Sequence, residues 1–433
     1  MADDWQEYIK DSRTVCKYGT KCYQKNPDHH KQFKHPPLKR KNDNRYKRRY
    51  TPYERPNRDL SPTPNPSTKQ VETNEDIETE PLQNTDKKEE TENVESVVIK
   101  LPEEITFYQK NEDPSLFREL FLIEMPSDFF KFYEFISELG ESAEKIMSDV
   151  NLELIGPYDL LLGKLPVLEK KELYLVHWRF FYDPPEFQAV IRKKKTEYHI
   201  GYFRDSPDQK AAFLASNDSS KDYHLKVMSE NIFGAVYLYL QNEKKNSPFT
   251  AVPCQKLMDK LKKYTEENNI SLDEFTMKKR QSEIVARCFH GAGIVVPYNK
   301  KTQQGYRRLA ETDANLKKMI TNLQTAKSEE EKNKILSDLQ CVVTNALIAV
   351  DECDFGTGLE LGIDLFCSGL KELHSIVLSN LTSVYTILNR KEFATIIERL
   401  ISSAYLTRDF NFVTFCSCGL LEFFWKCERA FKI

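Results

Sequence analysis

The sequence predicts an α+β protein, with a two-domain globular body behind a disordered linker and a small Cys/His-rich segment. Three observations predict this. Cysteines and histidines cluster within residues 1–36, apolar residues are sparse over 37–98, and apolar periodicity changes from strand-like to helical along 99–404. The chain has 433 residues, 40% hydrophobic and 12% aromatic, which is enough for two ordinary domains with their own cores.

Composition and charge exclude several broad classes. The formal net charge is -3, so the chain as a whole is not a basic nucleic-acid binder. Residues 1–4 (MADD) are acidic and no apolar segment follows them, so we expect no secretory signal and reduced cysteines, which are interpreted first as metal ligands. The longest apolar stretch, near 410–425, contains Asn411 and Glu422, so we expect no transmembrane helix and no membrane partner.

Residues 38–98 have the composition of a disordered linker, because they offer few apolar side chains to repay the entropy of folding. The first part is basic, with Lys39-Arg40-Lys41 and Lys47-Arg48-Arg49, and residues 70–98 are acidic. The split basic run is typical of a nuclear import signal or a nucleic-acid patch, and a merely soluble linker is the alternative. We interpret the acidic part as a solvated spacer.

The first body domain is predicted at 99–246 as a sheet with helices around it. Pro126-Ser127-Asp128 indicates the start of a helix, because apolar residues follow it at helical spacing. The aromatic and β-branched content of three segments predicts strands, at 173–182, 198–204 and 211–216. Between Ile232 and Leu240 apolar residues again recur at helical spacing.

The second body domain is predicted at 249–404 and is mainly α. Apolar patterns predict helices at 253–267, 271–286, 309–325 and 328–350, and further helices to about residue 404. Residues 287–296 are predicted as an extended segment that crosses a glycine-containing turn. Residues 405–433 form an atypical apolar tail, which is either an interaction segment or a terminus that does not pack.

The sharpest local signal is CKYGTKCYQKNPDHHKQFKH, in which Cys16, Cys22, His29 and His35 follow one another at short spacings. Two thiolates and two imidazoles supply the four ligands of a closed tetrahedral zinc site. The segment is too small to bury a core, so metal binding must provide most of its folding energy. We therefore predict a zinc finger at residues 10–37, with His30 as a rival to His29.

The same residues resemble the poly(ADP-ribose)-binding zinc finger family, PBZ. Arg13, Tyr18-Gly19 and Phe33 match basic and aromatic positions of that family, whereas Gln24 stands where the family has a basic residue. The resemblance implies that Tyr18, Tyr23 and Arg13 bind poly(ADP-ribose), with aromatic faces for adenine and a cation for the diphosphate. Packing of the two tyrosines against the zinc site is the alternative.

Carboxylates crowd the stretch VDECDFGTGLELGIDLFCSG at 350–369. It holds five acids, Asp351, Glu352, Asp354, Glu360 and Asp364, and Gly356 and Gly358 lie between the third and the fourth of them. Such crowding is costly unless a metal, a cation or a proton transfer uses it. Alternatively, the aspartates cap helices and Glu352 is simply exposed. The glycine spacing does not match a dinucleotide-binding fingerprint.

Residues 99–404 resemble the histone PARylation factor family, whose members are accessory proteins that redirect poly(ADP-ribose) polymerases to serine. The matching stretches occur in order along the body: GPYDLLLG at 156–163, HWRFFYDPPEFQ at 177–188, YHIGYFRDSPD at 198–208, FHGAGIVVP at 289–297, GYR at 305–307, ETDANLK at 311–317 and DECDFGTGLELGIDLFC at 351–367. The resemblance covers neither the tail nor the zinc finger.

That resemblance implies roles for four residues. Glu352 would enter the catalytic cleft of the polymerase as general base for the acceptor serine, and Asp351 would position it or contact the partner. Arg307, beside Tyr306, would dock the polymerase. NAD would be bound by the partner enzyme, so zinc would be the cofactor of this chain. The implied partners are a polymerase catalytic domain, histones and poly(ADP-ribose), in the nucleus on chromatin at sites of DNA damage.

The chain is not expected to be an enzyme on its own, and two rival hypotheses remain. The carboxylates of 351–364 could instead hold a divalent metal for a hydrolase reaction. The chain could also be a poly(ADP-ribose) reader or scaffold that takes no part in any chemistry, in which case replacing Glu352 would change nothing.

Overall fold

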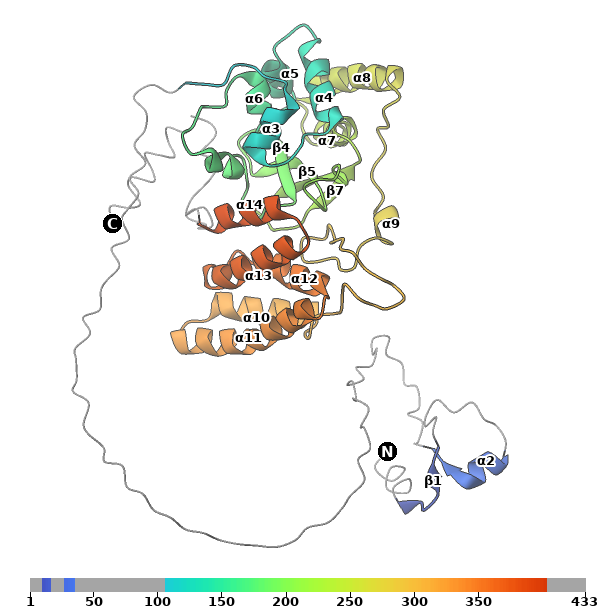
Figure 1. The fold of residues 1–433 in the computed structure, drawn as a ribbon. Coiled ribbons are helices and arrows are strands. Elements are labelled where there is room, and N and C mark those ends of the chain that lie inside the picture. Colours follow the sequence, from blue (N-terminus) through green and yellow to red (C-terminus); the bar gives the residue numbers. More distant parts are fainter. Residues whose placement is uncertain (1–9, 17–26, 36–105, 403–433) are drawn as a thin grey trace, which may run out of the picture. The chain divides into compact units, whose positions relative to one another are not determined.

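A computed structural model describes residues 10–16, 27–35 and 106–402, which fall into two compact units, 1–90 and 91–433 (Figure 1). The mixture of helices and strands confirms the predicted α+β class. The predicted linker at 38–98 and the apolar tail at 405–433 lie outside the described residues.

The described residues of the small unit form two short parallel strands and one helix: β1 (Thr14–Val15), α2 (Pro27–Gln32) and β2 (Phe33–Lys34). The Cys16 amide donates to the Lys34 carbonyl at 3.0 Å, which continues the pairing of the strands. Among the described residues of this unit only Cys16 is buried, with 3% exposed. Apolar burial there is therefore too small to hold the unit together.

The large unit is built on an antiparallel sheet of five strands that pair in chain order: β3 (Leu152–Leu154), β4 (Phe187–Lys193), β5 (Tyr198–Phe203), β6 (Phe213–Asp218) and β7 (Lys226–Ser229). β5 and β6 confirm the strands predicted at 198–204 and 211–216. Consecutive side chains along β4, β5 and β6 are buried, so both faces of the sheet are covered.

Helices surround this sheet in the first half of the unit (Figure 1): α3 (Pro114–Phe121), α4 (Ser127–Ser137), α5 (Ala143–Asp149), α6 (Tyr158–Leu162), α7 (Ile232–Asn246) and α8 (Ala251–Glu267), with the 3-10 helix η2 (Lys171–Val176). α4 begins where Pro126-Ser127-Asp128 predicted a helix start. α7 contains the predicted apolar stripe, and the Asn231 side chain caps it by accepting from the Gly234 amide at 3.0 Å.

The second half is mainly helical, as predicted. Its helices are α9 (Met277–Arg280), α10 (Asp313–Thr325), α11 (Glu329–Asp351), α12 (Phe355–Phe366), the 3-10 helix η3 (Lys371–Leu373), α13 (His374–Ile387) and α14 (Lys391–Ser402). The helices from α10 to α14 stack on one another (Figure 1). α11 starts in a reciprocal cap: the Glu331 amide donates to Ser328 Oγ at 3.2 Å, and Glu331 Oε2 accepts from the Lys327 amide at 3.1 Å. Cys353 then adopts a left-handed φ of 69°, which turns the chain from α11 into α12.

One main hydrophobic core extends through both halves of the large unit. Polar contacts also join them: the Tyr385 hydroxyl donates to Glu186 Oε1 at 2.7 Å, and Arg280 Nη1 donates to Asp205 Oδ2 at 2.7 Å. The proposed division of the body into 99–246 and 249–404 stays a prediction.

The strand predicted at 173–182 is wrong. Residues 171–176 form η2 instead, and Trp178 has a φ of 55°, which an extended strand does not permit. The strand of this region is β4, which starts only at Phe187. A short aromatic run without alternation fits a buried non-strand segment as well as a strand, so periodicity could not separate the two.

The helix predicted at 271–286 is also wrong, since only α9 forms there. The Phe275 amide donates to the Met228 carbonyl at 2.8 Å, which holds the segment against β7. Residues 287–296 contain the predicted glycine turn: Ala286 and Ile294 pair in an antiparallel bridge, and both Gly291 and Gly293 have a φ of 79°. In the segment 271–286, by contrast, a tertiary contact overrides the local pattern.

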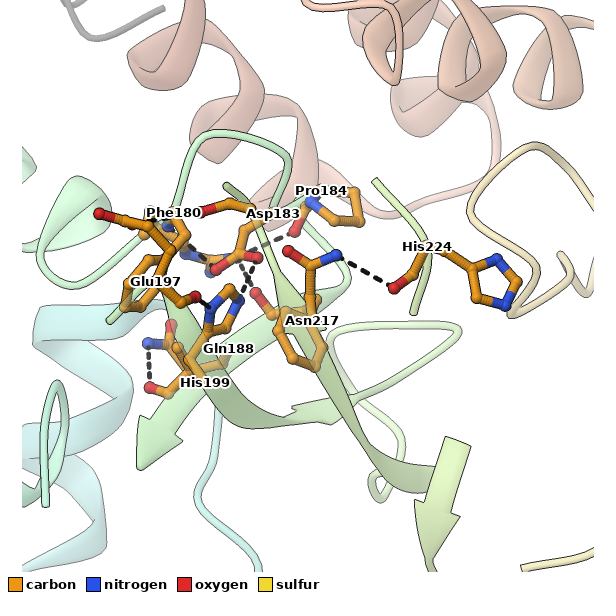
Figure 2. Close-up of polar contacts among 12 residues, drawn as sticks. Phe180, Asp183, Pro184, Gln188, Glu197, His199, Asn217 and His224 are labelled. Carbon is orange, nitrogen blue, oxygen red and sulfur yellow. Dashed lines mark hydrogen bonds and ion pairs between the residues drawn. The ribbon is translucent and has the colours of Figure 1, made fainter. Parts of the chain in front are cut away.

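Two of the family-like stretches meet in a buried hydrogen bond between Asp183 and His199 (Figure 2). His199 Nε2 lies 2.9 Å from Asp183 Oδ1, and His199 Nδ1 donates to the Glu197 carbonyl at 2.7 Å. Phe180 stacks on the His199 ring at 3.7 Å, and its amide donates to Asp183 Oδ2 at 3.0 Å. Both side chains of the pair are 0% exposed, so these motif residues join β5 to the segment before β4 and offer no surface to a ligand.

Candidate functional site

Three of the four predicted zinc ligands converge in the small unit. The ligand atoms of Cys16, His29 and His35 all lie within 4.8 Å of one another. Cys16 Sγ is 3.3 Å from His29 Nε2, which is 3.2 Å from His35 Nε2. Cys16 follows β1, His29 lies on α2 and His35 follows β2, so the pairing of the strands brings the three together. Cys22 lies outside the described residues.

The donor set and its spacing fit zinc. Zinc bonds of about 2.3 Å to sulfur and about 2.0 Å to nitrogen, at tetrahedral angles, separate the ligand atoms by roughly 3.4 Å. The observed separations of 3.3 and 3.2 Å are close to this value. Zinc bound there would connect both strands and the helix of a unit whose described residues bury little apolar surface, which is a structural role.

Arg13, predicted to bind poly(ADP-ribose), lies exposed just before β1, whereas Tyr18 and Tyr23 lie outside the described residues. Arg13 Nη2 is 2.6 Å from Asp11 Oδ2. The hydrogen bonds from Arg13 lower the pKa of Asp11 to about 2. An anion that binds Arg13 therefore competes with Asp11.

In the large unit, burial divides the carboxylates into two groups. Asp351 and Glu352 are exposed at the C-terminal end of α11. Asp354 is buried at the start of α12, and Glu360 and Asp364 are buried further along that helix. Only the exposed pair can reach a partner protein without unfolding.

Residues 305–307, which we call the GYR loop, lie against the first turn of α12. The Gly305 amide donates to Asp354 Oδ1 at 2.9 Å, and the Gly305 carbonyl accepts from the Gly356 amide at 2.9 Å. At the other end, Arg307 and Thr357 exchange two hydrogen bonds, of 3.0 Å from the Arg307 amide to Thr357 Oγ1 and 2.6 Å from Thr357 Oγ1 to the Arg307 carbonyl. Both ends of the loop are thus fixed to one helix.

Arg307 joins the GYR loop to the carboxylates. Its Nη1 forms an ion pair with Glu352 Oε2, and its Nε lies 3.6 Å from Asp354 Oδ2. The sequence indicated that a metal, a cation or a proton transfer uses these crowded acids, and the structure places the cationic side chain of Arg307 beside Glu352 and Asp354. The Glu352 side chain is 60% exposed and that of Arg307 is 41% exposed, so the pair is open to a partner surface.

The structure thus places the four residues of the predicted docking and catalytic set on two segments that the Arg307–Glu352 pair joins: Asp351 and Glu352 at the C-terminal end of α11, and Tyr306 and Arg307 on the GYR loop. Sequence reasoning missed Thr357, and it gave Asp354, one of the crowded acids, no part in anchoring the loop. The signal for Thr357 was the glycine pattern FGTG, in which Gly356 permits close contact: a Cβ there would lie 3.1 Å from the Gly305 carbonyl oxygen.

Comparisons with known proteins identify two families in this chain. Residues 113–403 match the family model of histone PARylation factor 1, and residues 13–38 match that of the PBZ domain. Histone PARylation factor 1 of Mus musculus is 40% identical over 294 residues, which cover 66% of this chain and 84% of the mouse protein. The Danio rerio protein of the same name is 39% identical over 291 residues, covering 66% of this chain and 83% of that protein.

The chain belongs to the histone PARylation factor family. The matched region contains the whole described part of the body from Asp113 onward, including the GYR loop and both exposed acids. The PBZ match covers Arg13 and all four predicted zinc ligands. In the described part of this family member, no helix is long and apolar enough to cross a membrane.

Proposed function

We propose that this chain is an accessory factor that binds a poly(ADP-ribose) polymerase and completes its active site, with Glu352 as general base for ADP-ribosylation of serine on proteins such as histones. Family membership supports the coarse role, since the relatives' name describes a factor for histone PARylation. One observation supports the finer role: the exposed Glu352 is held in place by Arg307 on a loop fixed to α12.

Glu352 has the chemistry that the reaction requires. A serine hydroxyl is a weak nucleophile at neutral pH, so its attack on C1″ of NAD is assisted when a carboxylate removes the proton. The Oγ–C1″ bond forms, the bond to nicotinamide breaks, and the proton moves to Glu352. NAD is bound by the polymerase. The ion pair with Arg307 engages Oε2 of Glu352, which leaves Oε1 to accept the proton.

Docking involves the surface around that carboxylate. Arg307 pairs with Glu352, Asp351 precedes it in the chain, and two apolar side chains lie one turn earlier on α11. These are Leu347 and Ile348, which are 40% and 47% exposed. Exposed apolar side chains next to charged groups are common at the centre of an interface.

The PBZ finger adds a second contact, with poly(ADP-ribose), through Arg13, Tyr18 and Tyr23. A chain that binds both the polymerase and its polymeric product gains effective concentration at sites where the polymer forms. We place this activity in the nucleus, on chromatin at sites of DNA damage, in accord with the basic run at 39–49.

The decisive experiment is Glu352→Gln, which preserves shape and removes the base. A polymerase, NAD and a histone peptide, with saturating variant chain, should show serine modification reduced roughly a hundredfold to ten-thousandfold, because base catalysis contributes about that much. Affinity for the polymerase should stay within a few-fold of the wild type, since the base acts mainly in the transition state.

Asp351→Asn is the matched control, because it alters the neighbouring exposed acid. It should affect affinity more than the rate at saturation. Serine modification by Glu352→Gln at the wild-type rate, with the complex saturated, would show that the chain is a reader or scaffold without a chemical role.

A further inference from the structure

One buried hydroxyl group, that of Thr357, accounts for both main-chain hydrogen bonds of Arg307 in the described part of the chain. Thr357 Oγ1 accepts from the Arg307 amide at 3.0 Å and donates to the Arg307 carbonyl at 2.6 Å. A hydroxyl group can do both at once, because it has one O–H donor and two acceptor lone pairs. Thr357 is 2% exposed, so water hardly competes for these two bonds.

The direction of this hydroxyl differs from that of other threonines in helices of this protein. A helical threonine commonly donates to a carbonyl of the preceding turn of its own helix. Thr265 of α8 donates to the Lys262 carbonyl at 3.0 Å in this way, and Thr395 of α14 donates to the Lys391 carbonyl at 3.1 Å. Thr357, in the first turn of α12, instead donates its proton to the GYR loop. Its hydroxyl therefore links two segments that are distant in the chain.

Arg307 in turn bridges the connection between α11 and α12. Its main chain is bound to Thr357 on α12, while its side chain pairs with Glu352 at the end of α11 and lies 3.6 Å from Asp354 Oδ2. Gly305 has hydrogen bonds of its own to the helix, but these fix the other end of the loop. The position of the guanidinium group thus depends on where Thr357 holds the main chain of Arg307.

We propose that Thr357 is a positioning residue of the composite active site: its hydroxyl holds the main chain of Arg307 where the guanidinium group can meet the polymerase and orient Glu352. This inference rests on the proposed function. Thr357 acts only through Arg307, because it is itself buried and has no surface to offer a partner or a substrate.

Removal of the hydroxyl leaves the Arg307 amide and carbonyl without these partners. Unpaired main-chain groups favour movement toward water, so the loop then occupies its binding-competent arrangement only part of the time. The apparent affinity falls in proportion to the fraction of chains in that arrangement. Loss of about one good hydrogen bond lowers the fraction, and hence the affinity, about tenfold.

The test is calorimetric binding of the full-length chain to a polymerase catalytic domain. Thr357→Val keeps the branched shape and removes the hydroxyl, so it should bind about tenfold more weakly than the wild type. Thr357→Ser keeps the hydroxyl and should bind within a few-fold of the wild type. If Thr357→Val does not fold, Thr357→Ala takes its place, because alanine removes the same hydroxyl and favours a helix. Equally weak binding by Thr357→Ser would show that the hydroxyl is not the cause and would overturn the role.

A matched control separates positioning from general destabilisation. Thr265→Val removes the hydroxyl of a threonine that is also 2% exposed, but whose hydrogen bond stays within α8. It should lower Tm, as Thr357→Val does, and leave affinity unchanged at temperatures where the chain is folded. A similar loss of affinity in Thr265→Val would show that destabilisation alone weakens binding, against a specific role of Thr357.

A double-mutant cycle with Arg307→Ala tests whether Thr357 acts through that side chain. In the Arg307→Ala background, Thr357→Val should have little further effect on affinity, because the guanidinium group that Thr357 positions is gone. An undiminished loss in that background would mean that Thr357 does not act through Arg307, and the positioning role would be wrong.

The outcomes separate the two proposals. If no polymerase binds the wild-type chain, the proposed function fails and the positioning role fails with it. If the polymerase binds the wild type and binds Thr357→Val as tightly, only the role of Thr357 is overturned.

Discussion

At the scale of single residues, Arg307 decides how the exposed acids are presented. Its guanidinium group contacts Glu352 and Asp354 at once, while its main chain is bound to Thr357. The planar guanidinium group of arginine has five N–H donors and can contact two carboxylates that lie in different directions. The single ammonium group of lysine is less suited to this arrangement. If Arg307 docks the polymerase as proposed, a substitution at 307 should affect docking and the orientation of Glu352 together.

Arg307→Ala should weaken binding to the polymerase tenfold or more, because an interface arginine commonly contributes about 2 kcal/mol or more. Tm should change little, since an exposed ion pair contributes at most about 1 kcal/mol to stability. Calorimetry and thermal unfolding measure both. The adjacent exposed Arg308→Ala is the control and should weaken binding less. Equal affinities for Arg307→Ala and the wild type would contradict the docking role.

At the scale of elements, α12 is the platform of the site. All its residues but Phe355 are buried, and its glycines permit close packing on different sides. Gly356 meets the GYR loop and Val296, whereas Gly362 meets Leu381 of α13. One helix thus carries the loop on its first turn and joins the helical layer further along.

Gly356→Ala should weaken polymerase binding several-fold, because the new Cβ would lie 2.9 Å from Val296 Cγ2 and 3.1 Å from the Gly305 carbonyl oxygen and must displace the loop. Overpacking of this kind costs about 1–3 kcal/mol. Gly362→Ala is the matched control: its Cβ would lie 2.4 Å from Leu381 Cδ2, so it should lower Tm without reducing affinity at temperatures where the protein is folded. Equal losses of affinity in Gly356→Ala and Gly362→Ala would contradict a specific role of the first turn of α12 in holding the GYR loop.

At the scale of the whole molecule, the two units are stabilised by different interactions. The large unit has one extended apolar core. The small unit, in its described residues, has three converging metal ligands and a single buried residue. The stability of the small unit should therefore depend on bound zinc and on pH, whereas the stability of the large unit should not depend on zinc.

A zinc chelator should abolish poly(ADP-ribose) binding by the full-length chain and leave the main thermal transition and polymerase docking unchanged. Cys16→Ser should behave like the chelated protein, because it removes one of the three converging ligands. Calorimetry with and without chelator, together with a polymer-binding assay, measures the three effects. A shift of the main transition by several degrees on chelation would show that zinc also supports the large unit.

The sequence by itself determined the features that depend on residues close together in the chain. Helical periodicity located α4, α7, α8, α10 and α11, and strand-like residue content located β5 and β6, because these signals lie within one element. The spacing of Cys16, His29 and His35 likewise predicted a shared metal site, and the structure brings all three together. Family-like stretches indicated Glu352 and Arg307 as a functional set.

Only the tertiary structure decided how separated segments contact one another. It placed residues 173–182 outside the sheet, stopped the helix expected at 271–286, and paired Arg307 with Glu352, which lies 45 positions further along the chain. It also buried Glu360 while leaving Glu352 exposed, although both acids belong to one crowded stretch. The physical reason is that burial and charge pairing depend on which surfaces meet after folding, and no local pattern records those surfaces.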